Sequence, residues 1–137
     1  MDAPILGFFK EYRWLSNFHI VEIVYEGLIY SSTEAAYMAS KTEDILVRQH
    51  LTQLTPREAK EFSPKIKLRN DWDRLRLGVM FDLLQIKYNQ PDLREKLLAT
   101  KDAYLEETNT WGDRFWGVDK TGLNMLGFLT MAVRKSL

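Results

Sequence analysis

Apolar residues near the N-terminus follow the pattern of β-strands. Residues 5–9 form one short apolar run, and residues 20–25 form a second run that is richer in β-branched side chains. Glu26 and Gly27 then offer a turn into a third run at residues 28–30. The pattern predicts a β-hairpin that is preceded by one more strand.

Helical signals begin at Ser31. The segment Ser31–Glu34 can form a capping box, in which a serine hydroxyl and a glutamate side chain bind backbone N–H groups at the start of a helix. Thr55–Glu58 repeats the pattern, with Pro56 at the first helical position, where its missing N–H is least costly. We therefore expect a helix after Ser31 and two short helices within residues 43–62.

The longest helical periodicity begins near Asp71. Apolar residues recur at helical spacing from Trp72 to Ile86, while basic side chains occupy positions between them, so this segment predicts the core helix. The remaining elements are a helix after Pro91, a short strand within residues 104–107, a packed functional loop at residues 109–122 and a final helix at residues 123–135.

The composition is that of one folded domain. Of the 137 residues, 45% are hydrophobic, and 19 basic residues balance 19 acidic ones, which argues against disorder. No apolar run approaches the roughly 20 residues that a membrane-spanning helix needs. The chain carries no internal repeat, low-complexity tract or Gly/Ser linker. We expect one domain over residues 1–137, of the α+β class and dominated by helices, with a small N-terminal β-hairpin.

Charge and residue counts exclude several kinds of function. A net charge of zero argues against a broad surface for a nucleic-acid backbone but leaves a nucleotide-sized ligand open. Without cysteine there is no disulfide, zinc–thiolate site or thiol nucleophile. With two histidines and no metal-binding, phosphate-loop or dinucleotide-binding motif, we expect no metal and no cofactor. The N-terminal segment lacks a secretory signal pattern, so a cytoplasmic location is expected.

Glu34 and Lys41 are the most suggestive pair of polar residues. They stand seven residues apart on the expected helix, so they lie on nearly the same face, with Tyr37 and Met38 between them. A lysine held against an aromatic, partly apolar wall can have a lowered pKa and attack a carbonyl or C1 carbon, while a nearby carboxylate moves the proton. The alternative is structural: Glu34 completes the capping box, and Lys41 complements the C-terminus of the helix.

Two further segments combine residues that suit a base-plus-ribose ligand. Arg13–Phe18 contains a guanidinium, a flat ring, a hydroxyl and an amide, and its alternative role is a tightly packed turn. Asp113–Gly117 places an aspartate and a tryptophan three residues apart beside a glycine, and its alternative is a buried aromatic residue that anchors the loop. The residues concerned are Arg13, Trp14, Ser16, Asn17, Asp113, Trp116 and Gly117.

Five segments, in family order and spread over nearly the whole chain, resemble the NADAR, or YbiA-like, family. They are RWLSNF at 13–18, YSSTEAAYMASK at 30–41, LRNDWDRLRLGVM at 68–80, DRFWG at 113–117 and GLNMLGFLTMAVR at 122–134. The resemblance implies a compact α+β fold and N-glycosidase chemistry on ribosylated bases.

The resemblance also implies roles for individual residues. The family motif has a glutamate and, seven residues on, a lysine that forms a Schiff base with the opened ribose, and these match Glu34 and Lys41. Asp113 would hold ribose hydroxyls or assist proton transfer. Ala35 and Met38 depart from the commoner histidine and glutamine, as does the glycine-poor segment 118–121, and these departures bear on base specificity. The expected substrate-binding residues are Arg13, Trp14, Ser16, Asn17, Tyr37, Trp72, Trp116, Gly117 and Asn124.

Two substrate classes fit the resemblance. One is ribosylamino-pyrimidines with a 5-phosphate, which are early riboflavin-pathway intermediates; the other is ADP-ribosyl groups attached to guanine in nucleic acid. The neutral charge favours the small molecules. Arg13, Lys67 and Arg69 are candidate phosphate contacts, with solvated surface charge as their alternative role. A membrane partner is not expected, and no feature indicates an oligomeric state.

One other mechanism and one other function stay open at this point. Glu34 and Asp113 could stabilise an oxocarbenium-like state as two carboxylates, with Lys41 serving only as a charge. In a different functional class, the chain would be a non-catalytic module that binds ADP-ribose or an NAD-like nucleotide. The presence of both Glu34 and Lys41 counts against such a module, because a binder needs no nucleophile and a buried unpaired lysine is costly.

Overall fold

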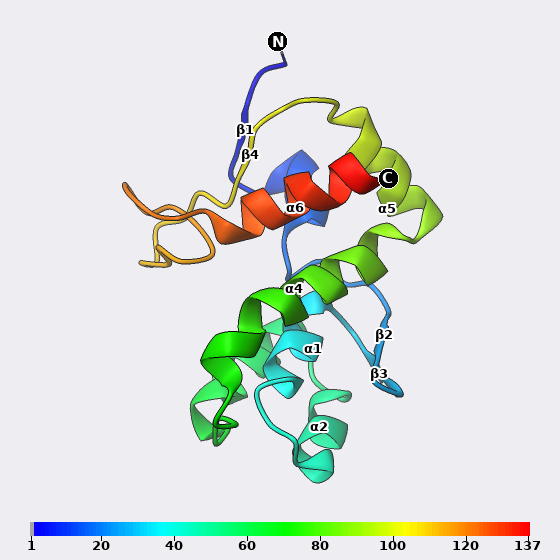
Figure 1. The fold of residues 1–137 in the computed structure, drawn as a ribbon, viewed down its shortest axis with the longest axis vertical. Coiled ribbons are helices and arrows are strands. Elements are labelled where there is room, and N and C mark those ends of the chain that lie inside the picture. Colours follow the sequence, from blue (N-terminus) through cyan, green and yellow to red (C-terminus); the bar gives the residue numbers. More distant parts are fainter. Residues whose placement is uncertain (1) are drawn as a thin grey trace. The chain divides into compact units, whose positions relative to one another are not determined.

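The computed structural model describes residues 2–137 (Figure 1). The chain divides into two compact units: one is Asn17–Lys87, and the other runs to Ser16 and resumes with Tyr88–Leu137. The predicted α+β class is confirmed, since most elements are helices and each of the two sheets has two strands. One domain over residues 1–137 stays a prediction. Within the described residues, no helix is both long and apolar enough to span a membrane.

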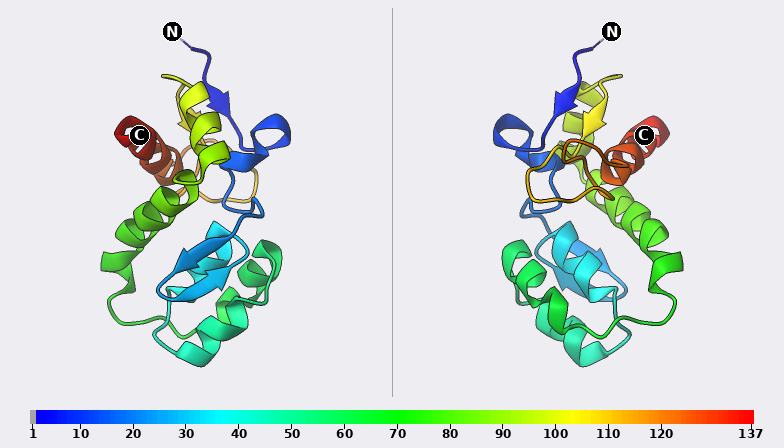
Figure 2. Two further views of the ribbon diagram at one scale, coloured as in Figure 1. Left: turned by 90° about the vertical axis from the view of Figure 1, so that its right-hand side faces the viewer. Right: turned by 90° about the vertical axis from the view of Figure 1, so that its left-hand side faces the viewer.

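The unit Asn17–Lys87 begins with the predicted hairpin. Strands β2 (Ile23–Tyr25) and β3 (Leu28–Tyr30) pair antiparallel, and both turn residues have a positive φ, 49° at Glu26 and 83° at Gly27. Two positive φ angles are typical of the type I′ turn, whose twist matches that of the strands. Figure 2 shows the hairpin beside helix α1 (Thr33–Ala39), with which both strands are in contact.

Helix α1 is buried along its whole length. Its N-cap is Ser32, whose hydroxyl accepts a hydrogen bond from the Ala35 N–H at 3.1 Å. The predicted capping box from Ser31 to Glu34 is therefore wrong: the helix starts one residue later, and the hydroxyl of Ser31 donates to the carbonyl oxygen of Leu54 at 2.7 Å. Glu34 is the second residue of the helix, which frees it from the role that the box would have given it.

The two short helices predicted within residues 43–62 are present as α2 (Ile45–Leu51) and α3 (Pro56–Phe62), and both pack on α1. The second predicted capping box is confirmed, with the Thr55 hydroxyl accepting from the Glu58 N–H at 3.1 Å and the Glu58 carboxylate accepting from the Thr55 N–H at 3.0 Å. These bonds hold the pKa of Glu58 below its usual range. A short 3-10 helix, η2 (Ser63–Lys65), follows α3 directly and was not predicted.

The long helix α4 (Trp72–Tyr88) confirms the predicted core helix. It buries Met80, Leu83 and Leu84 almost completely. Removing such apolar side chains from water stabilises a fold by about 1.5–3 kcal/mol each. The helix continues past Lys87, so no change of secondary structure marks the boundary between the units there.

The other unit contains a parallel pair of short strands. β1 (Ile5–Leu6) lies beside β4 (Leu105–Glu106), as Figures 1 and 2 show. The predicted helices are present as α5 (Pro91–Ala99) and α6 (Met125–Ser136), and α6 contacts β4. A 3-10 helix, η1 (Lys10–Leu15), was not predicted.

Candidate active site

Glu34 lies at the start of helix α1, and Lys41 lies just beyond its end. Glu34 is 8% exposed, in the first turn of the helix. The spacing had predicted that Lys41 lies on the helix. The helix ends at Ala39, however, so Lys41 lies in the turn beyond the C-cap. Its N–H still bonds to the carbonyl oxygen of Met38 at 3.2 Å, which prolongs the helical course of the backbone. The two side chains therefore interact, and the charge of Glu34 raises the pKa of Lys41.

The amine of Lys41 is enclosed by an aromatic ring and a hydroxyl. Its Nζ donates to the Oγ of Ser63 at 3.0 Å and lies 5.6 Å from the centroid of the Tyr37 ring. That ring in turn packs on Trp72, with 5.1 Å between the centroids. Burial lowers the pKa of Lys41 by more than Glu34 raises it, which favours the neutral amine, the nucleophilic form. The structure thus brings Glu34, Tyr37, Lys41 and Trp72 together, and their catalytic and substrate-binding roles stay predictions.

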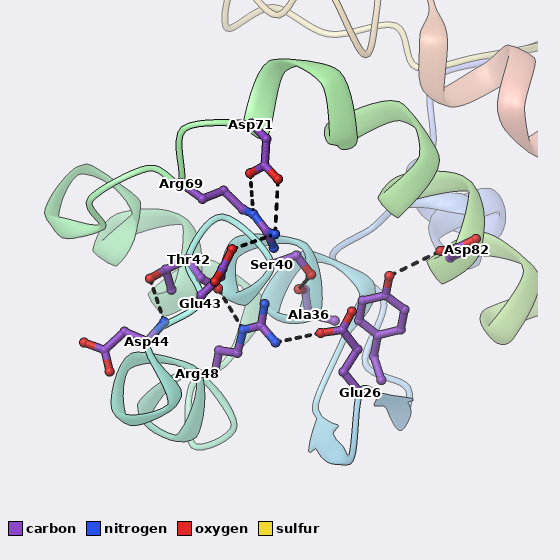
Figure 3. Close-up of polar contacts among 11 residues, drawn as sticks. Glu26, Ala36, Ser40, Thr42, Glu43, Asp44, Arg48, Arg69, Asp71 and Asp82 are labelled. Carbon is purple, nitrogen blue, oxygen red and sulfur yellow. Dashed lines mark hydrogen bonds and ion pairs between the residues drawn. The ribbon is translucent and has the colours of Figure 1, made fainter.

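Arg69 holds the backbone at Lys41, and Figure 3 shows the two carboxylates that its guanidinium binds. The N–H of Arg69 donates to the carbonyl oxygen of Lys41 at 2.8 Å. The guanidinium of Arg69 binds Asp71 at 2.7 Å and Glu43 at 2.9 Å, which fixes the segment just before α4 against the turn. Because both carboxylates occupy this guanidinium, the arrangement favours a structural role for Arg69 over a phosphate contact.

A second arginine holds the same turn from the side of the hairpin (Figure 3). The Nε of Arg48 donates to the carbonyl oxygen of Thr42 at 2.8 Å, and its Nη1 binds Glu26 at the tip of the hairpin at 2.6 Å. The hairpin is also tied to α4, since the hydroxyl of Tyr25 donates to Asp82 at 3.3 Å. Burial, assisted by the charge of Asp82, raises the pKa of Tyr25 to about 12. No local pattern along the chain predicts these long-range contacts.

Two buried polar atoms close to Glu34 have no hydrogen-bond partner within residues 2–137. They are the Oδ1 of Asn17 and the Oγ1 of Thr33. The carbonyl oxygen of Asn17 accepts from the Glu34 N–H at 3.1 Å, and its Nδ2 lies 3.6 Å from the sulfur of Met80. A buried polar group without a partner costs about 1–3 kcal/mol. A ligand hydroxyl or amide that reached these atoms would remove that cost.

Three predicted site residues before Asn17 belong to the other unit. Arg13 is exposed on η1, and Trp14 is buried with its ring edge-on to Tyr88, 6.3 Å between centroids. Ser16 ends η1, its N–H donating to the carbonyl oxygen of Arg13 at 2.9 Å. The contacts of Trp14 and Ser16 are those of a packed turn, which was the alternative role for this segment. A part in substrate binding stays a prediction for all three residues.

The loop at residues 109–122 is ordered by its own hydrogen bonds but is only partly packed: Gly117 is buried, whereas Trp111 is 56% exposed. The Oδ1 of Asp113 accepts from the N–H groups of Phe115 at 3.1 Å and Trp116 at 2.9 Å, so this carboxylate orders the turn. The Trp116 ring stands edge-on to Phe115 at 4.8 Å. Gly117 is required by close approach, because a Cβ there would overlap the carbonyl oxygen of Glu107. Catalysis by Asp113 and ligand binding by Trp116 and Gly117 stay predictions.

Asn109 organises this loop and was missed in the sequence. Its Nδ2 donates to the carbonyl oxygen of Asp113 at 2.8 Å, and its Oδ1 accepts from the Asp113 N–H at 3.1 Å. The side chain is buried, so both bonds are shielded from water. The only local signal was an asparagine at the start of a loop, a position that such side chains favour because they bind nearby backbone.

Asn124 lies in the same unit, where its amide joins α6 to β4. The Oδ1 accepts from the Glu107 N–H at 3.0 Å, and the Nδ2 donates to the Leu105 carbonyl oxygen at 2.9 Å and the Tyr104 hydroxyl at 3.1 Å. The residue is 1% exposed and has a φ of 52°, which is why α6 begins at Met125 and not at residue 123. These contacts give Asn124 a structural role, and its predicted place in a substrate pocket remains untested.

Asn124→Ala is expected to reduce the free energy of unfolding by about 2–4 kcal/mol. The change leaves the Leu105 carbonyl oxygen and the Glu107 N–H without their side-chain partner. It also places alanine at a positive φ, which alanine adopts less readily than asparagine. Urea denaturation measures the loss, and Asn124→Gly, which tolerates positive φ, should recover about 1 kcal/mol of it. A midpoint of urea denaturation that is the same for Asn124→Ala as for the wild-type protein would contradict this role.

The charged side chains offer no metal site. Within residues 2–137, no group of three or more His, Asp or Glu side chains could hold a metal ion. Around α1 the side chains supply a carboxylate, a partly desolvated amine, a hydroxyl and an amide. This set suits proton transfer and nucleophilic attack at carbon.

The fold and sequence match known proteins over nearly the whole chain. The solution structure of Escherichia coli YbiA superposes with a TM-score of 0.86 at 30% identity, covering 99% of this chain and 86% of that one. An N-glycosidase of Nostoc punctiforme is 33% identical over 93% of this chain and 87% of its own length. A riboflavin biosynthesis protein of Vibrio vulnificus is 31% identical over the whole chain, which spans 39% of that protein.

These matches define the class of protein first. Relatives covered over most of their length, among them YbiA of Escherichia coli at 30% identity, are named N-glycosidases, in agreement with the predicted glycosylase-type hydrolase. The model of the NADAR domain family matches residues 7–137. The chain belongs to the NADAR family, and the predicted family is confirmed.

Proposed function

We propose that the chain hydrolyses the C1–N bond between a phosphorylated ribose and a base, with Lys41 as nucleophile and Glu34 as proton donor and acceptor. The observation that carries this proposal is the enclosed amine of Lys41, which burial favours in its neutral form, within electrostatic reach of Glu34. The N-glycosidase names of the relatives support the same reaction class.

The proposed reaction has two stages. In the first, the lone pair of the Lys41 Nζ bonds to C1 while the C1–N bond breaks, and the ionised Glu34 takes a proton from Nζ and passes it to the base nitrogen, which keeps the electron pair of the broken bond. The sugar ring then opens to an iminium, C1=Nζ–H, and its ring oxygen takes a proton from a water molecule. In the second stage the hydroxide left by that water adds to C1, and Glu34 moves a proton from the new C1 hydroxyl to Nζ as the C1–Nζ bond breaks. The balance is one water consumed, with a base and a free sugar released.

The site around α1 suits a sugar with free hydroxyls. The unpartnered oxygens of Asn17 and Thr33 are buried close to Glu34, where they would bind polar groups of the substrate. The flat rings of Tyr37 and Trp72 offer surfaces on which a base can stack. We assign no step to Asp113, because its carboxylate accepts two backbone N–H groups.

We infer that the substrate is a small ribosylamino-pyrimidine and not an ADP-ribosylated base in nucleic acid. The zero net charge supports this, since an extended nucleic acid needs clustered cations. One relative is named for riboflavin biosynthesis, whose early intermediates have this chemistry. Arg48 and Arg69 do not form a free basic patch, because each is paired with a carboxylate.

The test is release of base together with capture of the sugar. The protein is incubated with a 5-phosphoribosylamino-pyrimidine and, separately, with ADP-ribosylated guanosine, and the products are separated by chromatography. In parallel, ribose 5-phosphate or ADP-ribose is added with borohydride, and the modified peptide is mapped by mass spectrometry, with Lys41→Ala as control. The expected result is pyrimidine release and a reduced adduct on Lys41. Binding without release or adduct would show a non-catalytic module instead.

A further inference from the structure

We propose that Ser63 is a further residue of this reaction: its hydroxyl oxygen orients the attacking Nζ of Lys41 and afterwards accepts the N–H of the iminium that joins Lys41 to the sugar. This inference rests on the proposed function. Ser63 is part of none of the motifs that carry the family resemblance, and no contact between Lys41 and a residue 22 positions away was expected.

The backbone of Ser63 is fixed where α3 meets η2. Its N–H donates to the carbonyl oxygens of Ala59 and Lys60, and its own carbonyl oxygen accepts from the Ile66 N–H at 3.0 Å. Helix α3 packs directly on α1. The hydroxyl therefore stands on a rigid support, as a group must if it is to hold a flexible lysine in one orientation.

A neutral oxygen suits this position better than a charged one. A carboxylate at 3.0 Å from Nζ would favour the ammonium form and raise the pKa of a lysine. A hydroxyl accepts the same hydrogen bond without opposing the effect of burial, so an amine with a lone pair is retained. After Nζ bonds to C1, the iminium has one N–H left, and Ser63 can accept it without any proton transfer.

Within residues 2–137, Glu34 is the charged group that shifts the pKa of Lys41. On η2, Lys65 lies with its Nζ 6.0 Å from the centroid of the Phe62 ring. The guanidinium of Arg69, next to the carbonyl of Lys41, is paired with carboxylates. Changes at Ser63 should therefore be read against Glu34 as the ionised neighbour that acts on Lys41.

The experiment compares Ser63→Ala, Ser63→Thr and Ser63→Asp in the full chain. The rate of the borohydride-trapped adduct with ribose 5-phosphate is measured against pH. Ser63→Ala should slow trapping about 10- to 100-fold, the effect of losing a hydrogen bond to a charged group, and Ser63→Thr should restore the rate to within about threefold. Ser63→Asp should move the rising limb of the pH profile upward by about one unit or more. Ser136→Ala, an exposed serine on α6, is the matched control.

The outcomes separate this inference from the function on which it rests. No adduct with the wild-type protein would contradict the proposed function itself. An adduct that forms at the wild-type rate in Ser63→Ala, or a Ser63→Asp profile that does not move, would overturn the role of Ser63 alone. If Ser63→Ala unfolds, Ser63→Thr and Ser63→Val decide: threonine keeps the hydroxyl and the trapping rate, whereas valine, of nearly the same shape without the hydroxyl, should lose about as much as alanine.

Discussion

Lys41→Arg is expected to abolish the borohydride-trapped adduct and to lower the rate of base release on the order of 10³-fold or more. Arginine keeps the positive charge and most of the length of the side chain. Its guanidinium stays protonated, however, and has no lone pair with which to attack C1. The turn itself should persist, because Arg69 and Arg48 hold it through backbone carbonyl groups.

The dependence of the rate of base release on pH tests the same prediction independently. Since burial lowers the pKa of Lys41, the wild-type rate should rise with pH and level off below 10.5, the ordinary value for lysine. Any residual activity of Lys41→Arg should lack that rising limb. Lys135→Arg, on the exposed end of α6, is the matched control. Near-normal base release by Lys41→Arg would favour the two-carboxylate route, in which the lysine serves only as a charge.

The pairing of Glu34 with Lys41 could be predicted because it depends on local geometry. Seven residues are about two helical turns, so two side chains at this spacing approach each other whether or not the last turn is regular. The helix did end before Lys41, and the cap moved from Ser31 to Ser32, yet neither change separated the pair. Spacing predicts such neighbours more reliably than it predicts the ends of a helix.

The residues that hold Lys41 could not be predicted in the same way. Three residues reach the lysine or its turn from other elements: Ser63 from η2, Arg48 from α2 and Arg69 from the segment before α4. Their places depend on how those elements pack. Periodicity shows which face of a helix is buried but not which residue of another helix it meets. Tertiary contacts of this kind decide the environment of the amine, and therefore its pKa.

The loop at residues 109–122 and the start of α6 show that a residue type alone does not reveal a residue's role. The aromatic and glycine content of the loop predicted a packed segment, but Trp111 is 56% exposed. The amide side chains in and beside the loop bind the backbone. Asn124 was expected in a substrate pocket, and its side chain instead binds the backbone at β4. An asparagine suits either role, because its side chain resembles a peptide group, and only the position of its partners distinguishes the two.

Glu34→Gln is expected to lower the plateau rate of base release about 10²- to 10⁴-fold, the usual contribution of a general acid–base group. The amide keeps the size of the side chain but can neither give nor take the proton. The same change removes the charge that raises the pKa of Lys41, so the rising limb of the pH profile should move to lower pH. The variant should therefore combine a more readily available nucleophile with a slower reaction.

These two effects make the role of Glu34 decidable in one experiment. The rate is measured from pH 5 to 10 with the pyrimidine substrate and with an analogue whose base needs no protonation to leave, on which Glu34→Gln should lose much less activity. A shifted limb with an unchanged plateau would mean that Glu34 only tunes the charge of Lys41. A lowered plateau with an unmoved limb would mean that the carboxylate acts on the substrate without sensing the amine. Only both changes together fit a carboxylate that serves the leaving base and the lysine in turn.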